Sequence, residues 1–421
     1  MVTDIEYEEA LKRLSKYGQE HLLCRYNDLD NTKKEKIISQ IKNIDFDKVK
    51  ELFNITCNSV KKIDGQVTNI DFVEKDKLSK EEYNKYYELG KKVIEEGKYA
   101  VVTMAGGQGT RLGYVAPKGT FKIGGGVEKS LFEALSDTIK EAKEKFKTRI
   151  PWYIMTSREN NNATEKFFEK NDFFGLPYED VKFFEQGELP MIDTNGKLML
   201  DETGLIKLAA DGHGGVFSSL ASNGYLEDMK KRNIEWIFIS GVDNVLAGLV
   251  DPIATGLAIV QGNLATGKSV LKRSPDEGVG VFCKKNGKPS VIEYTEITEE
   301  MANARNEKGE LIYGESHILT NLFNIKALEN IAQNKLPYHK AFKKAKYMDK
   351  NGGIIKPEKP NAFKYEIFLF DAFESLEDIS ILRVKREDEF APLKNSDGED
   401  SPNTARQLYI DYMKRKKKGL V

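Results

Sequence analysis

The 421-residue sequence predicts an α/β fold in which a doubly wound sheet is flanked by helices. From Lys98 onward, short apolar runs alternate with segments of helical period, and this alternation is typical of a sheet whose strands are joined by helices. The first apolar run breaks directly into glycines, and a later one ends at Asp243. Because ligands bind at the carboxyl ends of strands in such sheets, the site is expected there.

The first part of the chain, residues 1–97, is predicted to be a helical N-terminal region. It is rich in Lys and Glu, and its apolar residues recur at helical spacing. They are Leu11, Leu14, Ile37, Ile38, Ile41, Val49, Leu52 and Phe53. A last helix, "SKEEYNKYYELGKKVIEEG", begins with a possible capping box formed by Ser79 and Glu82 and ends at Gly97.

Residues 98–360 are predicted to form the catalytic domain. "YAVVTMA", "PWYIMTS" and "IEWIFISGVDN" are strands, whereas "SLFEALSDTIKEAKEKF" and "ATEKFFEKN" are helices. Two hairpins, "PMIDTNGKLMLD" and "GVFCKKNGKPSVIEY", turn at Asn195-Gly196 and Asn286-Gly287, both with the signal of a type I′ turn. Hairpins of this kind often form one wall of a substrate cleft.

Residues 361–421 are predicted to complete the active site and to end in a basic tail. A strand, "KYEIFLFDAF", and the polar loop "REDEFAPLKNSDGEDSPNTA" lead into a final helix. The tail "MKRKKKGLV" is expected to be solvated and disordered, as short terminal charge runs usually are.

The composition excludes several classes of partner. Sixty-five Lys and Arg balance 66 Asp and Glu, so nothing in the net charge favours nucleic acid or an acidic membrane. The three cysteines, Cys24, Cys57 and Cys283, are far apart and suit a reducing compartment. With no apolar signal segment and no run of membrane-spanning length, a cytoplasmic protein is expected.

The glycine loop "MAGGQGTRLG" follows its strand directly, so its backbone can turn tightly and approach a ligand closely. It lacks the lysine of a P-loop, and Leu112 stands where a dinucleotide motif requires its third glycine. Arg111, with Lys118 in "APKGTFKIG", can neutralise a triphosphate and the pyrophosphate that leaves it. The alternative interpretation is a tight turn flanked by surface cations.

These motifs resemble those of nucleotidyltransferases that join a sugar 1-phosphate to a nucleoside triphosphate. "AGGQGTRLG" with "PKGTF", then "FFEQGELP", "ADGHGG", "GVDN", "VIEYTEI" and "REDEFAPLKN" are similar to those of the eukaryotic UDP-N-acetylhexosamine pyrophosphorylases and, less closely, of UDP-glucose and UDP-sugar pyrophosphorylases. The similarity extends from about Tyr83 to Ala405. It implies a Rossmann-like, GT-A-like mixed sheet flanked by helices.

The resemblance also implies roles for individual residues. The cations implied to contact the phosphates during catalysis are Arg111, Lys118, Lys364 and Lys394. The nucleotide is implied to lie against Met104, Ala105, Gly106, Gly107, Gln186, Gly212 and Asp243, with Gln186 reading uracil. The sugar is implied to meet His213, Gly280, Glu293, Tyr294, His317, Phe368 and Phe370. Core packing explains the two phenylalanines, which alternate toward one face of a strand, equally well.

Asp243 is the predicted magnesium ligand. A carboxylate at the end of an apolar strand is costly unless it meets a cation, and Mg²⁺ bridging phosphate oxygens would supply one. The alternative interpretation is an N-cap for the helix "DPIATGLAI".

Two positions depart from the N-acetylhexosamine pattern. His213 and His317 stand where that subfamily has asparagines that contact the amino sugar, and an imidazole offers a different set of donors and acceptors. His213 therefore favours a non-acetylated or differently shaped hexose. The family's C-terminal, largely β domain, which contributes to assembly, is nearly absent, so a monomer is expected.

The hypothesis is a magnesium-dependent uridylyltransferase that makes a UDP-sugar and pyrophosphate from UTP and a hexose 1-phosphate, with N-acetylglucosamine 1-phosphate as the first candidate. Glucose 1-phosphate or a broader set of hexose phosphates is the alternative within the same chemistry. A catalytically inactive nucleotide-sugar sensor is the remote alternative, because it would not need Arg111, Lys118 and Asp243.

Overall fold

The protein is described by a computed structural model over residues 2–58 and 65–419, and it divides into two compact units. Unit 1 combines Met1–Lys61, Gly187–His213 and Pro337–Phe368, and unit 2 combines Lys62–Gln186, Gly214–Leu336 and Leu369–Val421. Both units therefore contain segments from each of the three spans predicted along the sequence.

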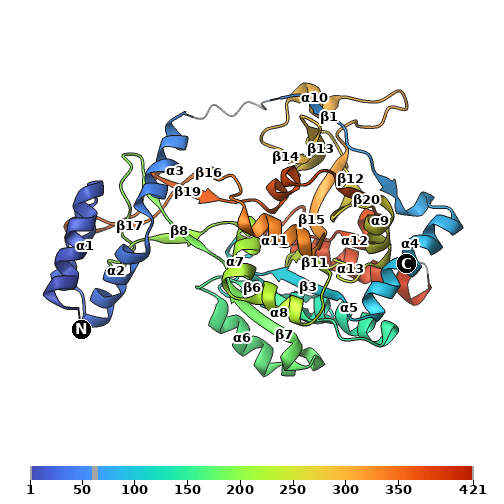
Figure 1. Cartoon of the computed structure of the whole chain (residues 1–421), viewed down its shortest axis with the longest axis horizontal. Helices are drawn as coiled ribbons and strands as arrows, with labels where there is room; N and C mark the ends of the chain where they lie inside the picture. The colour runs from blue at the N-terminus through green and yellow to red at the C-terminus, as the bar shows by residue number, and fades with distance from the viewer. Residues whose placement is uncertain (1, 59–64, 420–421) are drawn as a thin grey trace. The chain divides into compact units, whose positions relative to one another are not determined.

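Unit 2 is built around a mixed sheet in the order β2-β20-β12-β15-β11-β3-β6-β7, with the hairpin β13-β14 attached at β15 and the short β1 paired with β13 (Figure 1). Strands β11, β3, β6 and β7 are parallel, and β15 runs antiparallel between β11 and β12. The bounds are β1 Val67–Thr68, β2 Val73–Glu74, β3 Tyr99–Met104, β6 Trp152–Thr156, β7 Val181–Glu185, β11 Trp236–Gly241, β12 Ala265–Leu271, β13 Val281–Lys285, β14 Lys288–Ile292, β15 Glu315–Asn324 and β20 Ser380–Arg383. The predicted α/β class and mixed sheet are confirmed.

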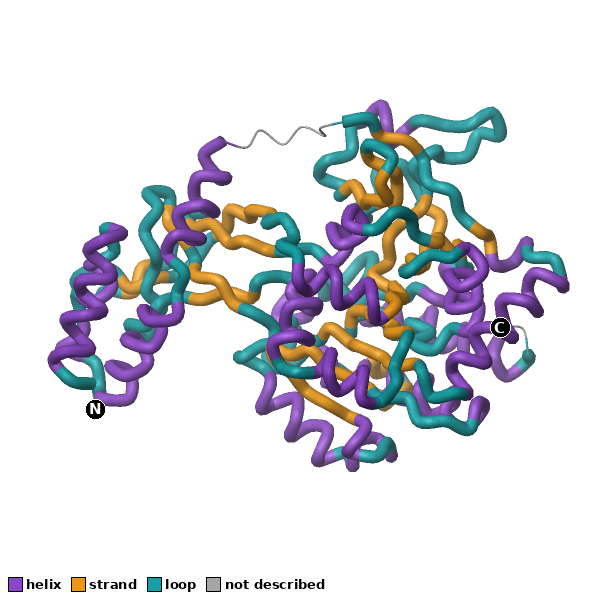
Figure 2. Tube along the Cα trace, in the orientation of Figure 1, coloured by secondary structure: helices purple, strands orange, loops and turns teal. Residues whose placement is uncertain are grey.

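Helices cover both faces of this sheet, as Figure 2 shows by colour. Val101 and Trp152 point to one face, where they pack with α4, α5, α6 and α13, whereas Tyr153 points to the other and contacts Tyr225 of α8. The bounds in unit 2 are α4 Lys80–Glu95, α5 Leu131–Phe146, α6 Asn161–Lys170, α7 Val216–Ser222, α8 Tyr225–Lys231, α9 Pro252–Gln261, α10 Glu299–Asn303, α11 Ile325–Gln333, α12 Arg386–Glu389 and α13 Pro402–Lys417. The predicted capping box is present: Ser79 Oγ accepts from Glu82 N at 3.2 Å, and the Glu82 carboxylate accepts from Ser79 N.

Unit 1 contains the N-terminal helices and small sheets. Helices α1 (Asp4–Tyr17), α2 (Asn31–Asn43) and α3 (Phe46–Asn58), blue in Figure 1, bury most of the predicted apolar positions in one core with Ile192 and Tyr365. The strands are β8 Glu188–Pro190, β9 Ile192–Asp193, β10 Leu208–Ala210, β16 His339–Lys343, β17 Tyr347–Met348, β18 Ile354–Ile355 and β19 Ala362–Glu366. They pair as β10-β8, β16-β19-β9 and β17-β18.

The two predicted hairpin turns differ. Asn286 and Gly287 both have positive φ, 51° and 81°, as a type I′ turn requires, and Lys285 pairs with Lys288. At Asn195-Gly196 only the glycine has positive φ, 78°, so the predicted type I′ turn is wrong there. Asp193 Oδ1 instead accepts from the backbone N of Asn195 and of Lys197, both at 2.8 Å, and this side chain closes the turn.

Two predictions for the C-terminal segment are also wrong. The predicted strand over residues 364–373 ends at Glu366, because Ile367 N donates to Asp211 O at 2.6 Å and a 3₁₀ helix follows at Leu369–Ser375. The basic tail is helical through Lys417, and Arg415 pairs with Asp388 at 2.8 Å. Lys416 pairs with Glu141, which further anchors the last turn.

Candidate active site

The carboxyl ends of parallel strands β11, β3, β6 and β7 meet at one edge of the sheet in unit 2. Neighbouring backbones bond there: Val242 N donates to Met104 O at 3.1 Å, Ala105 N to Met155 O at 2.7 Å, and Gln186 N to Thr156 O at 2.8 Å. The register therefore brings together three predicted site segments: the glycine loop after β3, Gln186 after β7 and Asp243 after β11.

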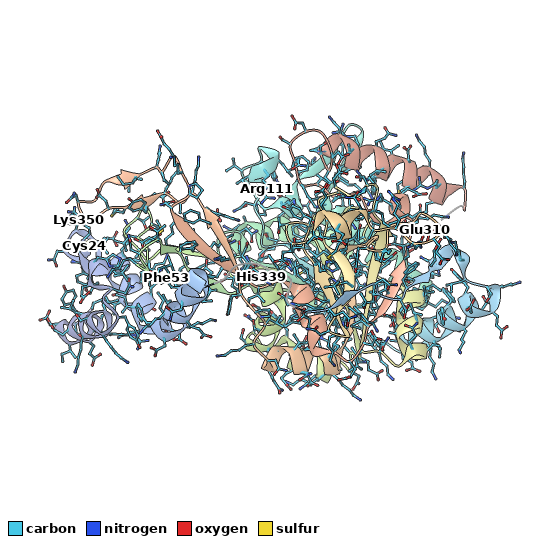
Figure 3. The ribbon with its side chains drawn as sticks, turned by 90° about the horizontal axis from the view of Figure 1, so that it is seen from above. Cys24, Phe53, Arg111, Glu310, His339 and Lys350 are labelled. Atoms are coloured by element: carbon cyan, nitrogen blue, oxygen red, sulfur yellow. The ribbon has the colours of Figure 1, made fainter. Side chains whose placement is uncertain are left out.

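The glycine loop is closed at its base by its own backbone. Lys118 N donates to Gly107 O at 3.1 Å, and Gly109 N donates to Ala116 O at 3.0 Å. This closure brings the "PKGTF" segment back to the start of the loop. Lys118 therefore lies beside the strand ends, even though it follows Arg111 by seven residues in the sequence. The guanidinium of Arg111 is exposed and forms no hydrogen bond or ion pair with any residue that the structure describes (Figure 3).

Asn160, which the motifs did not reveal, fixes the first residues of the loop. Its side chain is fully buried, its Nδ2 donates to Ala105 O at 3.0 Å and Gly107 O at 3.4 Å, and its Oδ1 accepts from Ser157 N at 2.8 Å. Both loop carbonyls therefore point toward this amide. The signal in the sequence was weak, because Asn160 is the first of three consecutive asparagines.

Gln186 packs directly on the glycine loop. A Cβ atom added at Gly106 would stand 2.5 Å from Gln186 Nε2, whereas one added at Gly107 would meet no described atom within 4 Å. A side chain at Gly106 would thus displace the Gln186 amide, and Gly107 leaves open space above the backbone. This arrangement suits a base held beside the Gln186 amide and phosphates held along the loop.

Asp243 forms an ion pair with Lys118 and also experiences the charge of Lys394. Its Oδ2 is 3.4 Å from Lys118 Nζ, and the Asp243 side chain is about 30% exposed and that of Lys118 about 16%. Burial alone would raise the pKa of Asp243, but the charges of Lys118 and Lys394 outweigh burial and hold the pKa below its usual value. The helix N-cap before "DPIATGLAI" is Asp251, whose Oδ1 accepts from Ile253 N at 2.9 Å, so the N-cap interpretation of Asp243 is wrong.

Lys394 is brought to Asp243 by the neighbouring Asn244. Asn244 Nδ2 donates to Glu389 O at 2.7 Å, and its Oδ1 accepts from Ala391 N at 2.9 Å. One residue earlier on the first segment, Asp243 O accepts from Leu393 N at 2.9 Å. The "GVDN" and "EFAPLKN" segments, about 150 residues apart, thus lie side by side, and Asn244 is a second positioning residue that the motifs did not single out.

Within residues 2–58 and 65–419, no group of three or more His, Cys, Asp or Glu side chains is placed to hold a metal ion. Asp243 pairs with Lys118, whereas Lys394 pairs with Asp400 at 3.4 Å, and Asp243 is ionised and partly exposed. Its oxygen atoms fit an Mg²⁺ ion that takes its remaining ligands from water and phosphate, as Mg²⁺ sites commonly do. The donor chemistry therefore suits a metal that arrives with the nucleotide.

Four of the predicted sugar residues lie around strands β13 to β15 of unit 2. His317 N donates to Gly280 O at 2.8 Å, and a Cβ at Gly280 would be 3.5 Å from Glu293 Oε1. The structure thus brings Gly280, Glu293 and His317 together, while Tyr294 next to Glu293 is 53% exposed.

The His317 ring stands among aromatic side chains. Its centroid is 5.0 Å from that of Phe282 and 5.7 Å from that of Phe370, and its Nε2 is 3.2 Å from Asn321 Oδ1. Phe370 is only 5% exposed and lies in the 3₁₀ helix rather than on a strand. Phe370 therefore packs against the imidazole, and the core-packing interpretation describes it better than direct sugar contact.

The other predicted site residues, Gly212, His213, Lys364 and Phe368, belong to unit 1. The Phe368 ring stacks with two imidazoles, at centroid distances of 5.4 Å for His213 and 4.4 Å for His339, which Figure 3 labels. Gly212 has φ 95°, and a Cβ there would be 2.4 Å from Ile367 O. Glycine is thus required next to His213.

Asp211, which precedes Gly212, is a further ionisable group that the motifs did not single out. Its backbone joins two strands, because Asp211 N donates to Gly187 O at 3.0 Å and Asp211 O accepts from Ile367 N. Its Oδ1 is buried without a hydrogen-bond partner among the described residues. Burial raises the pKa of Asp211 to about 6, although the charges of Lys48 and Lys364 act in the opposite direction.

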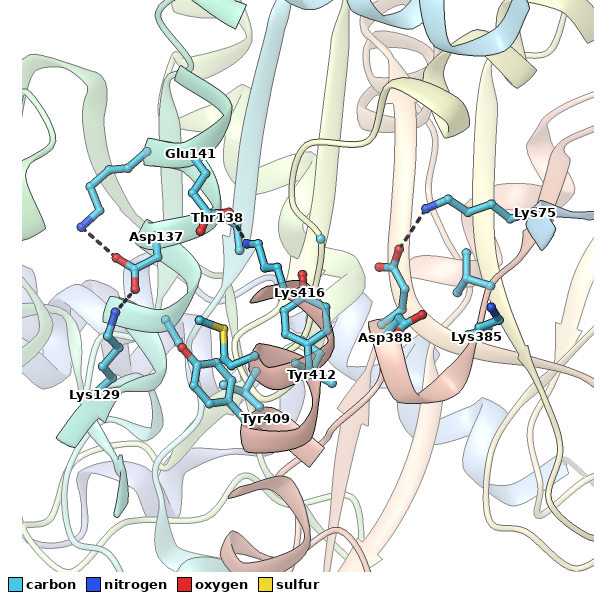
Figure 4. Close-up of a pocket in the computed structure, with 18 of the residues that line it drawn as sticks. Lys75, Lys129, Asp137, Thr138, Glu141, Lys385, Asp388, Tyr409, Tyr412 and Lys416 are labelled. Atoms are coloured by element: carbon cyan, nitrogen blue, oxygen red, sulfur yellow. Dashed lines mark hydrogen bonds and ion pairs between the residues drawn. The ribbon is translucent and has the colours of Figure 1, made fainter. Parts of the chain in front are cut away.

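A separate cavity of about 690 Å³ lies elsewhere in unit 2, between α5, α12 and α13 (Figure 4). Its walls include Tyr409 and Tyr412, the Lys129–Asp137 pair and Lys75, whose ammonium is 3.7 Å from Glu389. None of the predicted site residues lines it. The cavity is therefore distinct from the strand-end site in the part of the chain that the structure describes.

None of the described helices is both long enough and apolar enough to cross a membrane.

Comparison with known proteins agrees with this geometry. Residues 47–401 match the UTP–glucose-1-phosphate uridylyltransferase family. The chain is 40% identical over 344 residues to the UDP-N-acetylglucosamine pyrophosphorylase of Saccharomyces cerevisiae, covering 78% of this chain and 71% of that one. It is 34% identical over 424 residues to the human UDP-N-acetylhexosamine pyrophosphorylase-like protein 1, covering 96% and 84%.

Among solved structures, the uridine diphosphate N-acetylglucosamine pyrophosphorylase from Trypanosoma brucei in complex with an inhibitor is similar, with a TM-score of 0.79 and 30% identity over 98% of this chain and 85% of that one. The resemblance inferred from the motifs is therefore confirmed. The chain belongs to the UTP–glucose-1-phosphate uridylyltransferase family.

Proposed function

We propose that the protein is a uridylyltransferase that makes UDP-N-acetylglucosamine and pyrophosphate from UTP and N-acetylglucosamine 1-phosphate. The observation that supports this most directly is the cluster of Lys118, Asp243 and Lys394 beside a glycine loop at the carboxyl ends of parallel strands. The relative at 40% identity is named UDP-N-acetylglucosamine pyrophosphorylase and the one at 34% UDP-N-acetylhexosamine pyrophosphorylase-like protein 1, which supports the choice of sugar.

In the proposed reaction an oxygen of the sugar phosphate attacks the α-phosphorus of UTP in line. A new P–O bond forms, the bond from the α-phosphorus to the bridging oxygen breaks, and pyrophosphate leaves with the electron pair. Because the nucleophile is already an anion, no general base is required. Catalysis then depends on holding the two phosphates in position and on neutralising the charge that develops.

The charged side chains divide this task. Arg111 and Lys118 face the phosphates of UTP, and Lys364 and Lys394 are assigned to the phosphates of the substrates. The exposed guanidinium of Arg111 can turn to the triphosphate without breaking a bond to any described residue. Lys118 is already held at the loop base by its own backbone bond to Gly107. These residues supply the cations that a leaving pyrophosphate needs.

A magnesium ion is the proposed cofactor. Asp243 would hold it, and when bound it supplies positive charge to the phosphate oxygens. Gln186 is proposed to bind the uracil edge through its amide, next to the backbone of Met104 to Gly107. The sugar is proposed to meet His213, Glu293, Tyr294 and His317.

Glucose 1-phosphate, or a broader set of hexose 1-phosphates, is the second candidate. The specific observation in its favour is the imidazole of His213, which stacks on Phe368 where the N-acetylhexosamine subfamily has an amide. An inactive nucleotide-sugar sensor is disfavoured, because Lys118 and Asp243 form an ion pair at the strand ends and a sensor has no need of cations that stabilise pyrophosphate.

We further propose that the enzyme acts as a monomer in the cytoplasm and binds neither nucleic acid nor membranes. The balanced charge of 65 basic against 66 acidic residues supports the last two points. Light scattering of the purified protein tests the monomer, and a stable dimer would contradict it.

One assay tests the function. Purified protein with UTP and Mg²⁺ is offered N-acetylglucosamine, N-acetylgalactosamine, glucose and galactose 1-phosphates in parallel, and pyrophosphate release is measured. Fastest release with N-acetylglucosamine 1-phosphate is expected. Faster release with glucose 1-phosphate would favour the second candidate, and no release with any sugar would overturn the proposal. Repeating the assay with EDTA in place of Mg²⁺ should abolish turnover.

A further inference from the structure

The small sheet β16-β19-β9 of unit 1 has two different faces. Ala341 of β16 stands opposite Lys364 of β19, and Lys343 stands opposite Ala362. Directly opposed residues in a sheet point to the same side, so Lys343, Lys364 and Glu366 share one face. The alternate residue Tyr365 points to the other face and is buried in the core of unit 1.

On the shared face, Lys364 is already neutralised. Its Nζ lies 2.7 Å from Glu366 Oε1, and both side chains are at least three-quarters buried. A phosphate approaching this pair meets one positive and one negative charge of equal size. The pair by itself therefore offers no net charge for binding an anion.

Lys343 supplies the missing charge. It is exposed, and no hydrogen bond or ion pair joins its side chain to any residue among those described. It is two residues from the partner of Lys364 along β16, so the two lysines are diagonal neighbours across the strand pair. Burial would raise the pKa of Glu366, but Lys364 and then the charge of Lys343 lower it, so Lys343 lies near enough to act on this carboxylate.

We propose that Lys343 is a phosphate-binding residue of the uridylyltransferase and that it acts with Lys364 on the same face of β16 and β19. This inference rests on the proposed function and extends its set of phosphate contacts to a strand that no sequence motif marked. Lys343, Lys364 and Glu366 together carry one net positive charge, and that charge comes from Lys343. The bound group is a phosphate of UTP, of the sugar 1-phosphate or of pyrophosphate.

The neighbouring Lys344 provides a matched control. It is also exposed and also without a bonded partner among the described residues, but it follows the last residue of β16 and has no partner in β19. If Lys343 acts only as a solvated surface lysine, Lys343→Ala and Lys344→Ala should behave alike. If Lys343 binds phosphate, only Lys343→Ala should raise KM.

The experiment measures KM for UTP and for the sugar 1-phosphate, and KM for pyrophosphate in the reverse direction, at low and at high salt. Lys343→Ala is expected to raise KM for at least one phosphate substrate about tenfold at low salt, with a smaller effect at high salt. The substrate affected identifies which phosphate is bound. Equal KM values for Lys343→Ala and Lys344→Ala would overturn the inference.

A second substitution separates charge from structure. Glu366→Gln removes the negative charge beside Lys364, so the double variant Lys343→Ala/Glu366→Gln again carries one net positive charge and should recover KM to within about threefold of the wild type. If KM does not recover in a folded double variant, Lys343 does not act through its positive charge. If the wild type itself releases no pyrophosphate, the proposed function fails. Isothermal titration of the three variants with pyrophosphate alone would still test Lys343.

Discussion

Lys118 Nζ lies 3.4 Å from Asp243 Oδ2, and this pair joins the glycine loop after β3 to the end of β11. Each of these two charges therefore has a partner before any ligand binds. The charges of Lys118 and Lys394 together lower the pKa of Asp243 against the effect of burial. A site whose charges already hold one another in place needs little rearrangement when phosphates and a metal bind.

Lys118→Ala and Arg111→Ala are each expected to lower turnover by more than about a hundredfold, because each removes a cation from the charge that develops on the leaving pyrophosphate. Lys122→Ala is the matched control: Lys122 is 65% exposed and pairs with Glu128 on a surface hairpin. Pyrophosphate release is measured, with circular dichroism to verify the fold. Near-normal turnover in a folded Lys118→Ala variant would contradict the assignment.

Gly106→Ala is expected to disturb the nucleotide base. The new methyl group would stand 2.5 Å from Gln186 Nε2, so the glutamine side chain must move, which is cheap for the fold but costly for base recognition. KM for UTP should rise about tenfold, and discrimination between UTP and CTP should fall. An unchanged UTP-to-CTP ratio would show that Gln186 does not bind the base.

Gly107→Ala tests whether the phosphates of UTP lie along the backbone of the same loop. Its methyl group would meet no described protein atom within 4 Å, so the thermal stability should be unchanged. If the phosphates lie along this backbone, UTP affinity should nevertheless fall, because the methyl group occupies their space. Full UTP affinity in this variant would place the triphosphate elsewhere.

The sequence predicted those parts of the site whose functional residues directly follow an apolar run. The glycine loop, Gln186 and Asp243 each end a strand, and the register of parallel strands then brings them together without further information. Asn160 and Asn244 could not be predicted in this way. Which asparagine of "RENNN" turns inward depends on the turn in which Asn160 N bonds to Ser157 O, and the sequence does not mark that turn.

The aromatic residues show a second limit. Alternation in "EIFLFD" predicted a continuous strand that carries Phe368 and Phe370 on one face, but the strand ends where Ile367 bonds to Asp211, about 150 residues earlier in the chain. The two side chains then separate: Phe368 stacks with His213 and with His339, and Phe370 packs against His317. The local alternation of apolar residues does not reveal such long-range hydrogen bonds.

Lys268→Met is expected to destabilise unit 2 by about 3–5 kcal/mol, because it removes the buried cation that lies nearest to two buried carboxylates. The Lys268 side chain is only 1% exposed, and its Nζ lies 2.7 Å from Asp251 and 2.8 Å from Glu389. Urea unfolding measures the change. Lys385→Met, at a lysine that is 50% exposed and paired with Asp76, should cost less than about 1 kcal/mol. Equal effects of the two substitutions would contradict a buried charge cluster.

Asp211→Asn is expected to stabilise unit 1 at neutral and alkaline pH but not at acidic pH. Burial raises the pKa of Asp211 to about 6, above the value of about 3.9 in an unfolded chain. The folded state therefore binds the proton more tightly than the unfolded state. The cost of burying the carboxylate is fully present above about pH 6 and disappears as the pH falls toward 4.

Since an amide cannot ionise, the difference in unfolding free energy between Asp211→Asn and the wild type should approach about 3 kcal/mol at pH 8 and shrink toward zero near pH 4. Calorimetry across this pH range measures it. Asp28→Asn, at an aspartate that is 57% exposed and paired with Arg25, serves as the control and should change stability little at any pH. If the difference in unfolding free energy is the same at pH 8 and pH 5, Asp211 does not titrate between these pH values. The charge on its buried carboxylate then does not destabilise the fold.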